Sequence, residues 1–444
     1  MKERNEVNLT VYFRWAWSSL TPIVETENGK IKGLVKHFKN GVQYHFYGIP
    51  YAEPPLGSLR FEKPRKAEKW SNTREAFRVP KSCLQPVFNM LYEDRPMSED
   101  CLYLNILMRE DPELNKSSGK RPVMVFIHGG ALQDGSGTDF PYLSDVLVDH
   151  HDIILVTLNY RLNVFGFIQH NIYKEFIPNL GLLDQNMAIK WVKNNIAKFG
   201  GDDENITIFG QSAGAESVYF HMISPYTRGL FKRAILMSGQ PLFLYAKDLI
   251  GNLTGRPDEF FAITDNDYIP KNPVYDRDIN ILIGALPEDG AYILPETDTR
   301  VFTKPKLDYS DGYQILRRYF NDKAAKRLMR HYFPLIKVPI NEIIKNGAIE
   351  LTSDVIFYCP TFELANRYSR ENKKAKTFAY ILNRAPSTQR VSLCDLDKTI
   401  GVCHGDDLFY VFGTPFRKPY LFNDEDRKMS EKMMKIWTDF ARKG

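Results

Sequence analysis

The stretch Ile206-Thr207-Ile208-Phe209-Gly210-Gln211-Ser212-Ala213-Gly214 decides the fold. Residues 206–209 are β-branched or aromatic and predict a buried strand, while residues 215–222 are compatible with a helix. Two glycines flank Ser212 in a G-x-S-x-G pattern, because side chains at those positions would clash in a sharp turn from strand to helix. The pattern predicts that Ser212 lies at the apex of this turn as a nucleophile. A purely structural turn is the alternative.

Further strands and helices follow on both sides of this turn. Residues 123–127 and 153–158 are short apolar runs rich in β-branched residues, which predicts strands buried on both faces, as in a parallel sheet. Ala188, Val192 and Ile196 recur at helical spacing and predict a crossover helix, and residues 429–440 predict another helix. This alternation predicts an α/β doubly wound fold. Because no linker or repeat interrupts the chain, we expect a single domain over residues 1–444.

Composition excludes several classes of protein. The chain has 444 residues, of which 43% are hydrophobic and 25% charged, with a net charge of +5. A disordered or fibrous protein is excluded, and the charge is too dilute for a nucleic-acid-binding surface. No apolar run is long enough to predict a membrane span. Arg14 splits the only hydrophobic stretch near the N-terminus, so no signal-peptide core is expected there.

A glycine-rich loop follows the strand predicted over residues 123–127, with the sequence His128-Gly129-Gly130-Ala131-Leu132. Such a loop exposes backbone N–H groups, which can stabilise the oxyanion that forms during acyl transfer. We predict that the backbone N–H groups of Gly130, Ala131 and Ala213 form an oxyanion hole. A turn that simply needs glycines is the alternative.

Two further motifs connect the chain to a known family. Residues 48–61 read GIPYAEPPLGSLRF and residues 98–105 read SEDCLYLN. With the G-x-S-x-G turn, they resemble the signatures of the type B carboxylesterases and cholinesterases, which have the α/β-hydrolase fold, and the resemblance covers nearly the whole chain. It implies a serine esterase that hydrolyses small carboxylic esters through an acyl-enzyme. We expect no cofactor, metal ion or nucleic acid.

The resemblance also implies a catalytic triad in the order Ser, acid, His. By its place in residues 400–408, His404 corresponds to the family's general base. Asp289 occupies the slot before Gly290, where the family carries Glu, and is the predicted acid. The neighbouring Glu288 is the alternative, because a turn rotated by one residue would bring its side chain to the histidine instead.

Two positions bear on the substrate. Cholinesterases carry Glu immediately before the nucleophile, whereas this chain has the neutral Gln211, and residues 84–100 lack the family's choline-binding Trp. Tyr292 matches one aromatic residue of the substrate pocket. We therefore expect neutral esters to be favoured over choline esters. A non-catalytic adhesion or binding relative and an acetylcholinesterase-like hydrolase are the two alternatives.

The cysteines and sequons predict a secreted glycoprotein. The resemblance implies a Cys83–Cys101 disulfide, structural ion pairs Arg60–Glu99 and Arg161–Asp184, and an unpaired Cys359; Cys394 and Cys403 could form a bridge or be two thiols. Four Asn-x-Ser/Thr sequons stand at Asn8, Asn115, Asn205 and Asn252. From the comparison with the family pattern, we expect part of a helical block after residue 240 and a segment after Gly444 to be missing from this chain. The oligomeric state is not predicted.

Overall fold

The computed structural model describes residues 19–38, 41–86, 96–111, 120–168, 175–240, 262–275, 277–336, 338–388 and 400–444. Their strands are β1 (Val24–Thr26), β2 (Gly29–Lys32), β3 (Leu34–Phe38), β4 (Gly41–Pro50), β5 (Arg74–Glu75), β6 (Ser82–Cys83), β7 (Met97–Ser98), β8 (Tyr103–Arg109), β9 (Arg121–Ile127), β10 (Ile154–Leu158), β11 (Gly201–Gln211), β12 (Arg233–Met237), β13 (Asn280–Ala285) and β14 (Thr377–Ile381).

The α-helices are α1 (Asp145–His151), α2 (Asn163–Phe167), α3 (Leu180–Asn195), α4 (Ala213–Ile223), α7 (Leu294–Thr297), α8 (Arg300–Thr303), α9 (Tyr309–Tyr319), α10 (Asp322–Tyr332), α11 (Ile340–Ser353), α12 (Cys359–Glu371), α13 (Asp406–Val411), α14 (Thr414–Arg417) and α15 (Asp424–Lys443). Short 3-10 turns are η1 (Gly57–Leu59), η3 (Ile196–Phe199), η4 (Pro225–Thr227) and η6 (Asp289–Ala291), and η7 (Asp354–Tyr358) is a π-helix.

A nine-stranded sheet forms the centre of the molecule, in the order β14-β13-β12-β11-β9-β10-β8-β4-β3. The six strands from β14 to β10 are parallel, and β8, β4 and β3 continue the sheet with antiparallel pairing. The strands predicted over residues 123–127, 153–158 and 206–209 lie in β9, β10 and β11 at the middle of this sheet. The prediction of an α/β fold with a mostly parallel sheet is confirmed.

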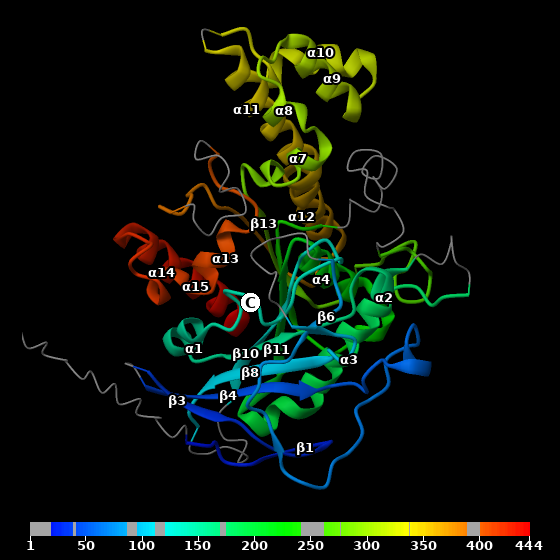
Figure 1. The fold of residues 1–444 in the computed structure, drawn as a ribbon, viewed down its shortest axis with the longest axis vertical. Helices are drawn as coiled ribbons and strands as arrows, with labels where there is room; N and C mark the ends of the chain where they lie inside the picture. The colour runs from blue at the N-terminus through cyan, green and yellow to red at the C-terminus, as the bar shows by residue number, and fades with distance from the viewer. Residues whose placement is uncertain are drawn as a thin grey trace, which may run out of the picture.

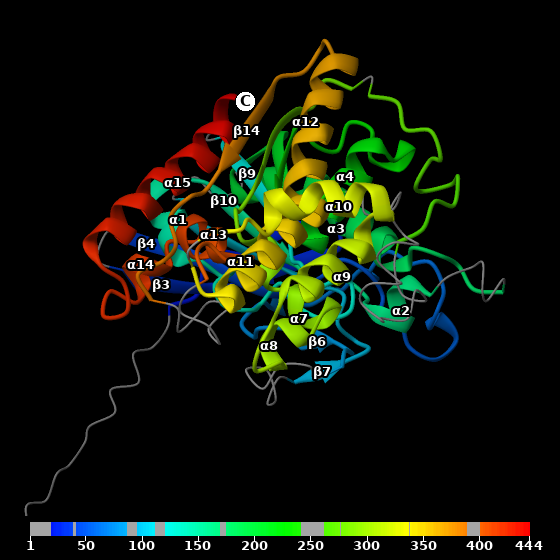
Figure 2. The ribbon, with the colours of Figure 1, turned by 90° about the horizontal axis from the view of Figure 1, so that it is seen from above.

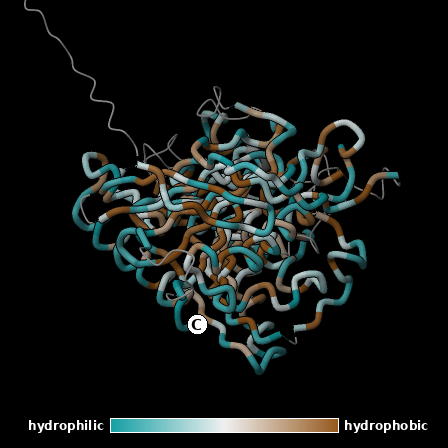
Figure 3. The backbone as a smooth tube through the Cα atoms, turned by 90° about the horizontal axis from the view of Figure 1, so that it is seen from below, coloured by the Kyte–Doolittle hydropathy of each residue, from teal (hydrophilic) through white to brown (hydrophobic). Residues whose placement is uncertain are grey.

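Helices cover both faces of the sheet. Strand β9 is apolar throughout, and because side chains alternate, Val123 and Val125 enter the core shared with α3, α4 and α12, while Met124 and Phe126 enter the core shared with α1, α13 and α15. Figures 1 and 2 show these two helical layers on opposite sides of the strands. In Figure 3 the hydrophobic segments gather in the interior, with hydrophilic segments around them. Both layers therefore hold the strand ends in fixed positions.

A third group of helices, α7 to α11, lies beyond one end of the sheet, at the top of Figure 1. It has its own apolar core, which includes Leu316, Phe333, Ile344 and Leu351 and reaches Ile400 and Cys403. This group therefore touches the segment that carries the predicted catalytic histidine. Among the described residues, no helix has the length and apolar character needed to cross a membrane.

Candidate active site

Ser212 lies between the end of β11 and the start of α4. Its backbone has φ 57° and ψ −131°, a region that residues with a side chain rarely adopt, and its N–H donates to Met237 O over 2.8 Å. A Cβ atom at Gly210 would lie 2.4 Å from the carbonyl of Gly214, and one at Gly214 would lie 2.1 Å from Ile127 O. Both glycines are therefore required sterically, as the motif predicts.

His404 and Asp289 meet in the buried interior. His404 Nδ1 lies 2.7 Å from Asp289 Oδ1, and because a carboxylate only accepts, Nδ1 carries the proton and donates. Asp289 begins the η6 turn after β13, and its Oδ2 accepts hydrogen bonds from Ser238 Oγ at 2.8 Å and Leu286 N at 2.7 Å. The carboxylate is thus fixed through both oxygens at the carboxyl edge of the parallel strands.

Glu288 points to a different partner. Its Oε2 accepts a hydrogen bond from Val402 N over 2.7 Å, in the segment that leads into His404. Burial is the main cause that raises the pKa of this carboxyl group. The two adjacent acids therefore hold different atoms: Asp289 contacts the imidazole, and Glu288 contacts the backbone before it.

The other nitrogen of His404 faces Gln211. The two Nε2 atoms lie 3.0 Å apart, and since Nδ1 carries the proton, the amide of Gln211 donates to the free lone pair on His404 Nε2. The Tyr292 ring stacks on the imidazole at a centroid distance of 5.5 Å, and Phe357 lies at 4.8 Å. The imidazole is thus enclosed by two aromatic rings and a neutral amide.

The loop that contains Gly130 and Ala131 lies beside the serine. A Cβ atom at Gly129 would lie 3.0 Å from Ser212 Cβ, and positive φ angles of 103° at Gly130 and 53° at Ala131 turn the loop at this point. Within the described part of the chain, the N–H groups of Gly130, Ala131 and Ala213 donate no hydrogen bond to protein. Three donors next to a serine are what an oxyanion hole requires.

A further acid lies behind the His404–Asp289 pair. Asp407 is fully buried and accepts from Tyr380 OH over 2.9 Å. Burial first, and the nearby charge of Asp289 second, raise the pKa of Asp407 to about 7. The raised pKa favours the protonated form of Asp407, and this form limits the repulsion between two carboxyl groups in this interior.

Comparison with known proteins agrees with this geometry. A sequence model of the carboxylesterase family matches residues 20–250 and 250–444. The chain belongs to the carboxylesterase family. It is 33% identical over 507 residues to bile salt-activated lipase from Rattus norvegicus, and this match covers 99% of this chain and 80% of that protein. It is 29% identical to acetylcholinesterase from Bungarus fasciatus and 30% identical to acetylcholinesterase-1 from Trittame loki; each match covers 95% of this chain, with 78% and 86% of those proteins respectively.

Membership of the carboxylesterase family confirms three predictions: the family resemblance, the α/β-hydrolase fold and the enzyme class, carboxylic ester hydrolase. The roles of Ser212, Asp289 and His404, of the three oxyanion donors, and of Gln211 and Tyr292 in the substrate pocket stay predictions. The structure joins Asp289 and Gln211 to His404 through hydrogen bonds, stacks Tyr292 on His404, and brings Gly129, the residue before Gly130, to Ser212.

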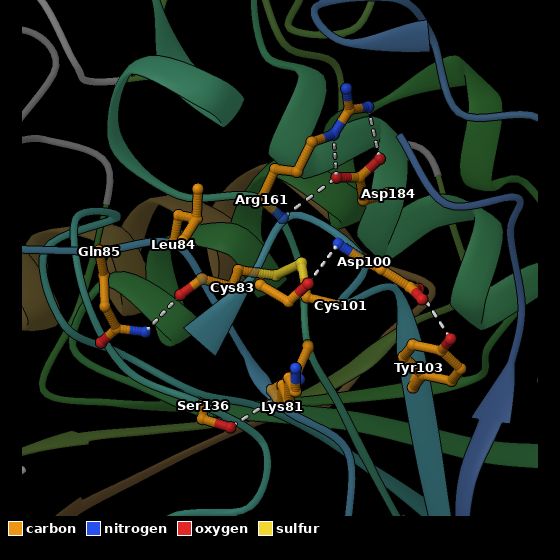
Figure 4. Close-up of a disulfide and its surroundings, with 12 residues drawn as sticks. Lys81, Cys83, Leu84, Gln85, Asp100, Cys101, Tyr103, Ser136, Arg161 and Asp184 are labelled. Atoms are coloured by element: carbon orange, nitrogen blue, oxygen red, sulfur yellow. Dashed lines mark hydrogen bonds and ion pairs between the residues drawn. A yellow bond between two sulfur atoms is a disulfide. The ribbon is translucent and has the colours of Figure 1, made fainter. Parts of the chain in front are cut away.

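The disulfide of this carboxylesterase is confirmed between Cys83 and Cys101 (Figure 4). Arg161 forms an ion pair with Asp184 at 2.8 Å in the same region, and Arg60 pairs with Glu99 at 2.5 Å. Cys359 is a free, exposed thiol, Cys403 is disulfide-bonded, and Cys394 lies outside the described residues. The disulfide and the ion pairs fix the loop before β8 against the core.

One of the four predicted sequons falls on described residues. Asn205 is half-buried in β11, and its side-chain oxygen accepts a hydrogen bond from Arg233. Asn8, Asn115 and Asn252 lie outside the described residues, so glycosylation stays a prediction at all four positions.

Two residues of the site were missed from sequence: Ser238, which binds Asp289, and Phe357, which packs on His404. Glu288 was named as the alternative acid, but its contact with Val402 N was not predicted. Ser238 carried a usable signal, because it directly follows an apolar strand and polar residues at carboxyl ends of parallel strands often belong to sites. Phe357 carried none, since only the packing of η7 brings it to the histidine.

Proposed function

We propose that this carboxylesterase hydrolyses small neutral carboxylic esters through an acyl-enzyme on Ser212. The observation that carries the proposal is the buried contact of 2.7 Å between His404 Nδ1 and Asp289 Oδ1. The other nitrogen of His404 contacts Gln211, which precedes Ser212 at the apex of the strand-helix turn. A serine hydroxyl is a weak nucleophile and needs such a base beside it.

In the proposed mechanism, the amide of Gln211 leaves His404 Nε2, which then takes the proton of Ser212 as Oγ attacks the ester carbonyl carbon. Asp289 keeps the proton of the neutral imidazole on Nδ1 and stabilises the imidazolium that forms. The N–H groups of Gly130, Ala131 and Ala213 stabilise the oxyanion, each worth about 3 kcal/mol by analogy with known oxyanion holes. The imidazolium then gives its proton to the leaving alcohol, and water hydrolyses the acyl-enzyme by the same steps.

A neutral substrate is supported by the residue beside the histidine. Gln211 carries no charge, so the site lacks a carboxylate at this position that would attract a quaternary ammonium group. The relatives are named for an acetylcholine ester and for lipid, and the chemistry that both share is the carboxylic ester. We also propose that the chain is a single domain. Secretion is supported by the Cys83–Cys101 disulfide, because such bonds persist in oxidising compartments.

The test is covalent labelling. An organophosphate should react with Ser212 and abolish hydrolysis of p-nitrophenyl acetate in proportion to labelling. Ser212→Ala should be inactive and unlabelled, while Ser58→Ala, a matched change at an exposed serine, should behave as the unchanged protein. An active enzyme with the label on a different residue would refute the assignment.

A further inference from the structure

A cluster of three metal-ligating side chains lies outside the catalytic site. His331 stands at the end of α10, Glu350 on α11, and Asp354 at the start of η7. One ligating atom from each residue lies within 4.8 Å of the others. Glu350 and Asp354 are four residues apart on a continuous helical segment, which places both carboxylates on one face, and α10 packs against α11.

In the part of the chain that the structure describes, no lysine or arginine forms an ion pair with Glu350 or Asp354. Instead, the hydroxyl of the buried Tyr332 donates to Asp354 Oδ2 over 3.0 Å and leaves Oδ1 available. An outer hydrogen bond that orients one oxygen of a carboxylate is a common feature of metal sites, where it fixes the ligand.

The ligand types select the ion. One imidazole and two carboxylates suit a divalent transition metal, whereas Ca²⁺ and Mg²⁺ prefer oxygen ligands alone. With metal–ligand bonds of about 2.1 Å, tetrahedral ligands lie about 3.4 Å apart. The present limit of 4.8 Å therefore requires a contraction of up to about 1.4 Å, which side-chain rotations together with a small approach of α10 and η7 can supply.

We propose that His331, Glu350 and Asp354 bind a divalent transition-metal ion of the Zn²⁺ type, with water completing its coordination. The site joins the end of α10 to the end of α11 and the start of η7, so the ion acts as a clamp between these helices.

The clamp is connected to the catalytic residues. Ser353, next to Asp354, accepts a hydrogen bond at Oγ from Gly290 N over 2.9 Å, and Gly290 follows Asp289. Phe357, in the same π-helix as Asp354, packs on the His404 ring. Both contacts, Ser353 with Gly290 and Phe357 with His404, are already formed without a metal ion. Contraction of the metal site should therefore displace these two contacts and lower kcat. This second step rests on the proposed function, whereas metal binding does not.

Binding is tested by titrating the full chain with Zn²⁺ in a calorimeter and with Co²⁺ by visible absorption. One ion per chain is expected, together with a Zn²⁺-dependent rise in Tm. His331→Ala and Glu350→Gln should weaken binding by more than the roughly 10- to 100-fold that loss of an outer partner causes, and Tyr332→Phe should fall within that range. The matched controls His37→Ala and Glu342→Gln change exposed residues outside the cluster and should bind normally.

Unchanged Zn²⁺ affinity in both His331→Ala and Glu350→Gln would overturn the site. The Tm of each variant without metal shows whether it is folded, so a loss of binding by unfolding is recognised.

Coupling is tested by turnover of p-nitrophenyl acetate. Zn²⁺ should lower kcat of the unchanged protein and leave kcat of His331→Ala unaltered. Bound Zn²⁺ without any change in kcat would overturn the coupling. An inactive but Zn²⁺-binding protein would contradict the proposed function and leave the metal site standing.

Discussion

At the scale of single residues, two adjacent acids have separate tasks. Asp289 contacts His404 Nδ1, and Glu288 holds the N–H of Val402 in the segment before the histidine. The separation arises because consecutive side chains at the start of η6 point in different directions. The shorter Asp reaches the imidazole because the turn brings its backbone close to the ring.

We predict that Asp289→Asn lowers kcat by up to about four orders of magnitude, because an amide cannot hold the correct tautomer or stabilise the imidazolium. Glu288→Gln should retain most activity, since its side-chain oxygen can still accept from Val402 N. Both variants are compared by kcat on a p-nitrophenyl ester, with Tm as the control for folding. If instead Glu288→Gln is the inactive variant, Glu288 orients the histidine.

A site residue could be predicted from the sequence alone when the motif that marks it is made of neighbouring residues. Ser212 follows from five consecutive residues whose glycines have steric reasons. Asp289 and His404 required the family resemblance, because they are 115 residues apart and nothing local pairs them. The contact between Gln211 and His404 spans 193 residues and depends on side-chain packing, so no pattern could predict it.

At the scale of elements, helix α4 begins directly after Ser212 and carries a buried histidine, His221, near its C-terminal end. His221 donates from Nε2 to Gln185 Oε1 at 2.8 Å and accepts at Nδ1 from Tyr268 OH at 2.7 Å. Burial lowers the pKa of His221 from 6.5 to about 3. The helix is therefore anchored by an imidazole that must stay neutral.

This predicts a loss of stability in acid. The unfolded chain binds a proton at His221 near pH 6.5 and the folded chain only near pH 3, so the free energy of unfolding decreases as pH falls between these values and levels off below about 3. Each pH unit in this window contributes about 1.4 kcal/mol.

Denaturant unfolding at several pH values measures this slope. His221→Gln should reduce it, while His37→Gln, a change at an exposed histidine, should leave it as it is. An identical slope in His221→Gln would contradict the prediction, whatever the absolute stability of the variant.

Among the elements, the central strands β9, β10 and β11 and the helices α3, α4 and α15 were predicted, and the group α7 to α11 was not. Runs such as residues 123–127 carry their own periodicity, so β9 follows from sequence. The position of α10 against α11 depends on the core around Phe333 and Ile344, which joins distant residues. For the same reason, no sequence spacing indicated that His331 lies beside Glu350.

At the scale of the whole molecule, two layered cores hold the strands and a third core covers the histidine. The site between them presents Gln211, Tyr292 and Phe357 around His404, without a carboxylate from the residue before the nucleophile. Apart from the Asp289 carboxylate at Nδ1, the side chains that contact the imidazole are thus neutral, and two of them are aromatic.

We predict little or no preference for choline esters. The ratio of kcat/KM for acetylthiocholine to that for a neutral acetate ester of similar size should stay below about ten, equivalent to about 1.4 kcal/mol of selective transition-state binding. Gln211→Glu should raise the ratio, because it places a negative charge beside the substrate. A higher ratio in the unchanged protein would favour an acetylcholinesterase-like activity.

The backbone conformation that holds Ser212 at the apex of its turn lowers the stability of the folded chain. Its φ of 57° and ψ of −131° suit glycine, and holding a residue with a side chain there costs about 1–3 kcal/mol. Ser212→Gly should therefore be more stable than Ser212→Ala by about 1 kcal/mol in denaturant unfolding, although both variants lack the hydroxyl. Equal stabilities would mean that the turn stores no strain. If the difference is found, selection for catalytic turnover has kept a residue at position 212 that makes the folded chain less stable than glycine would.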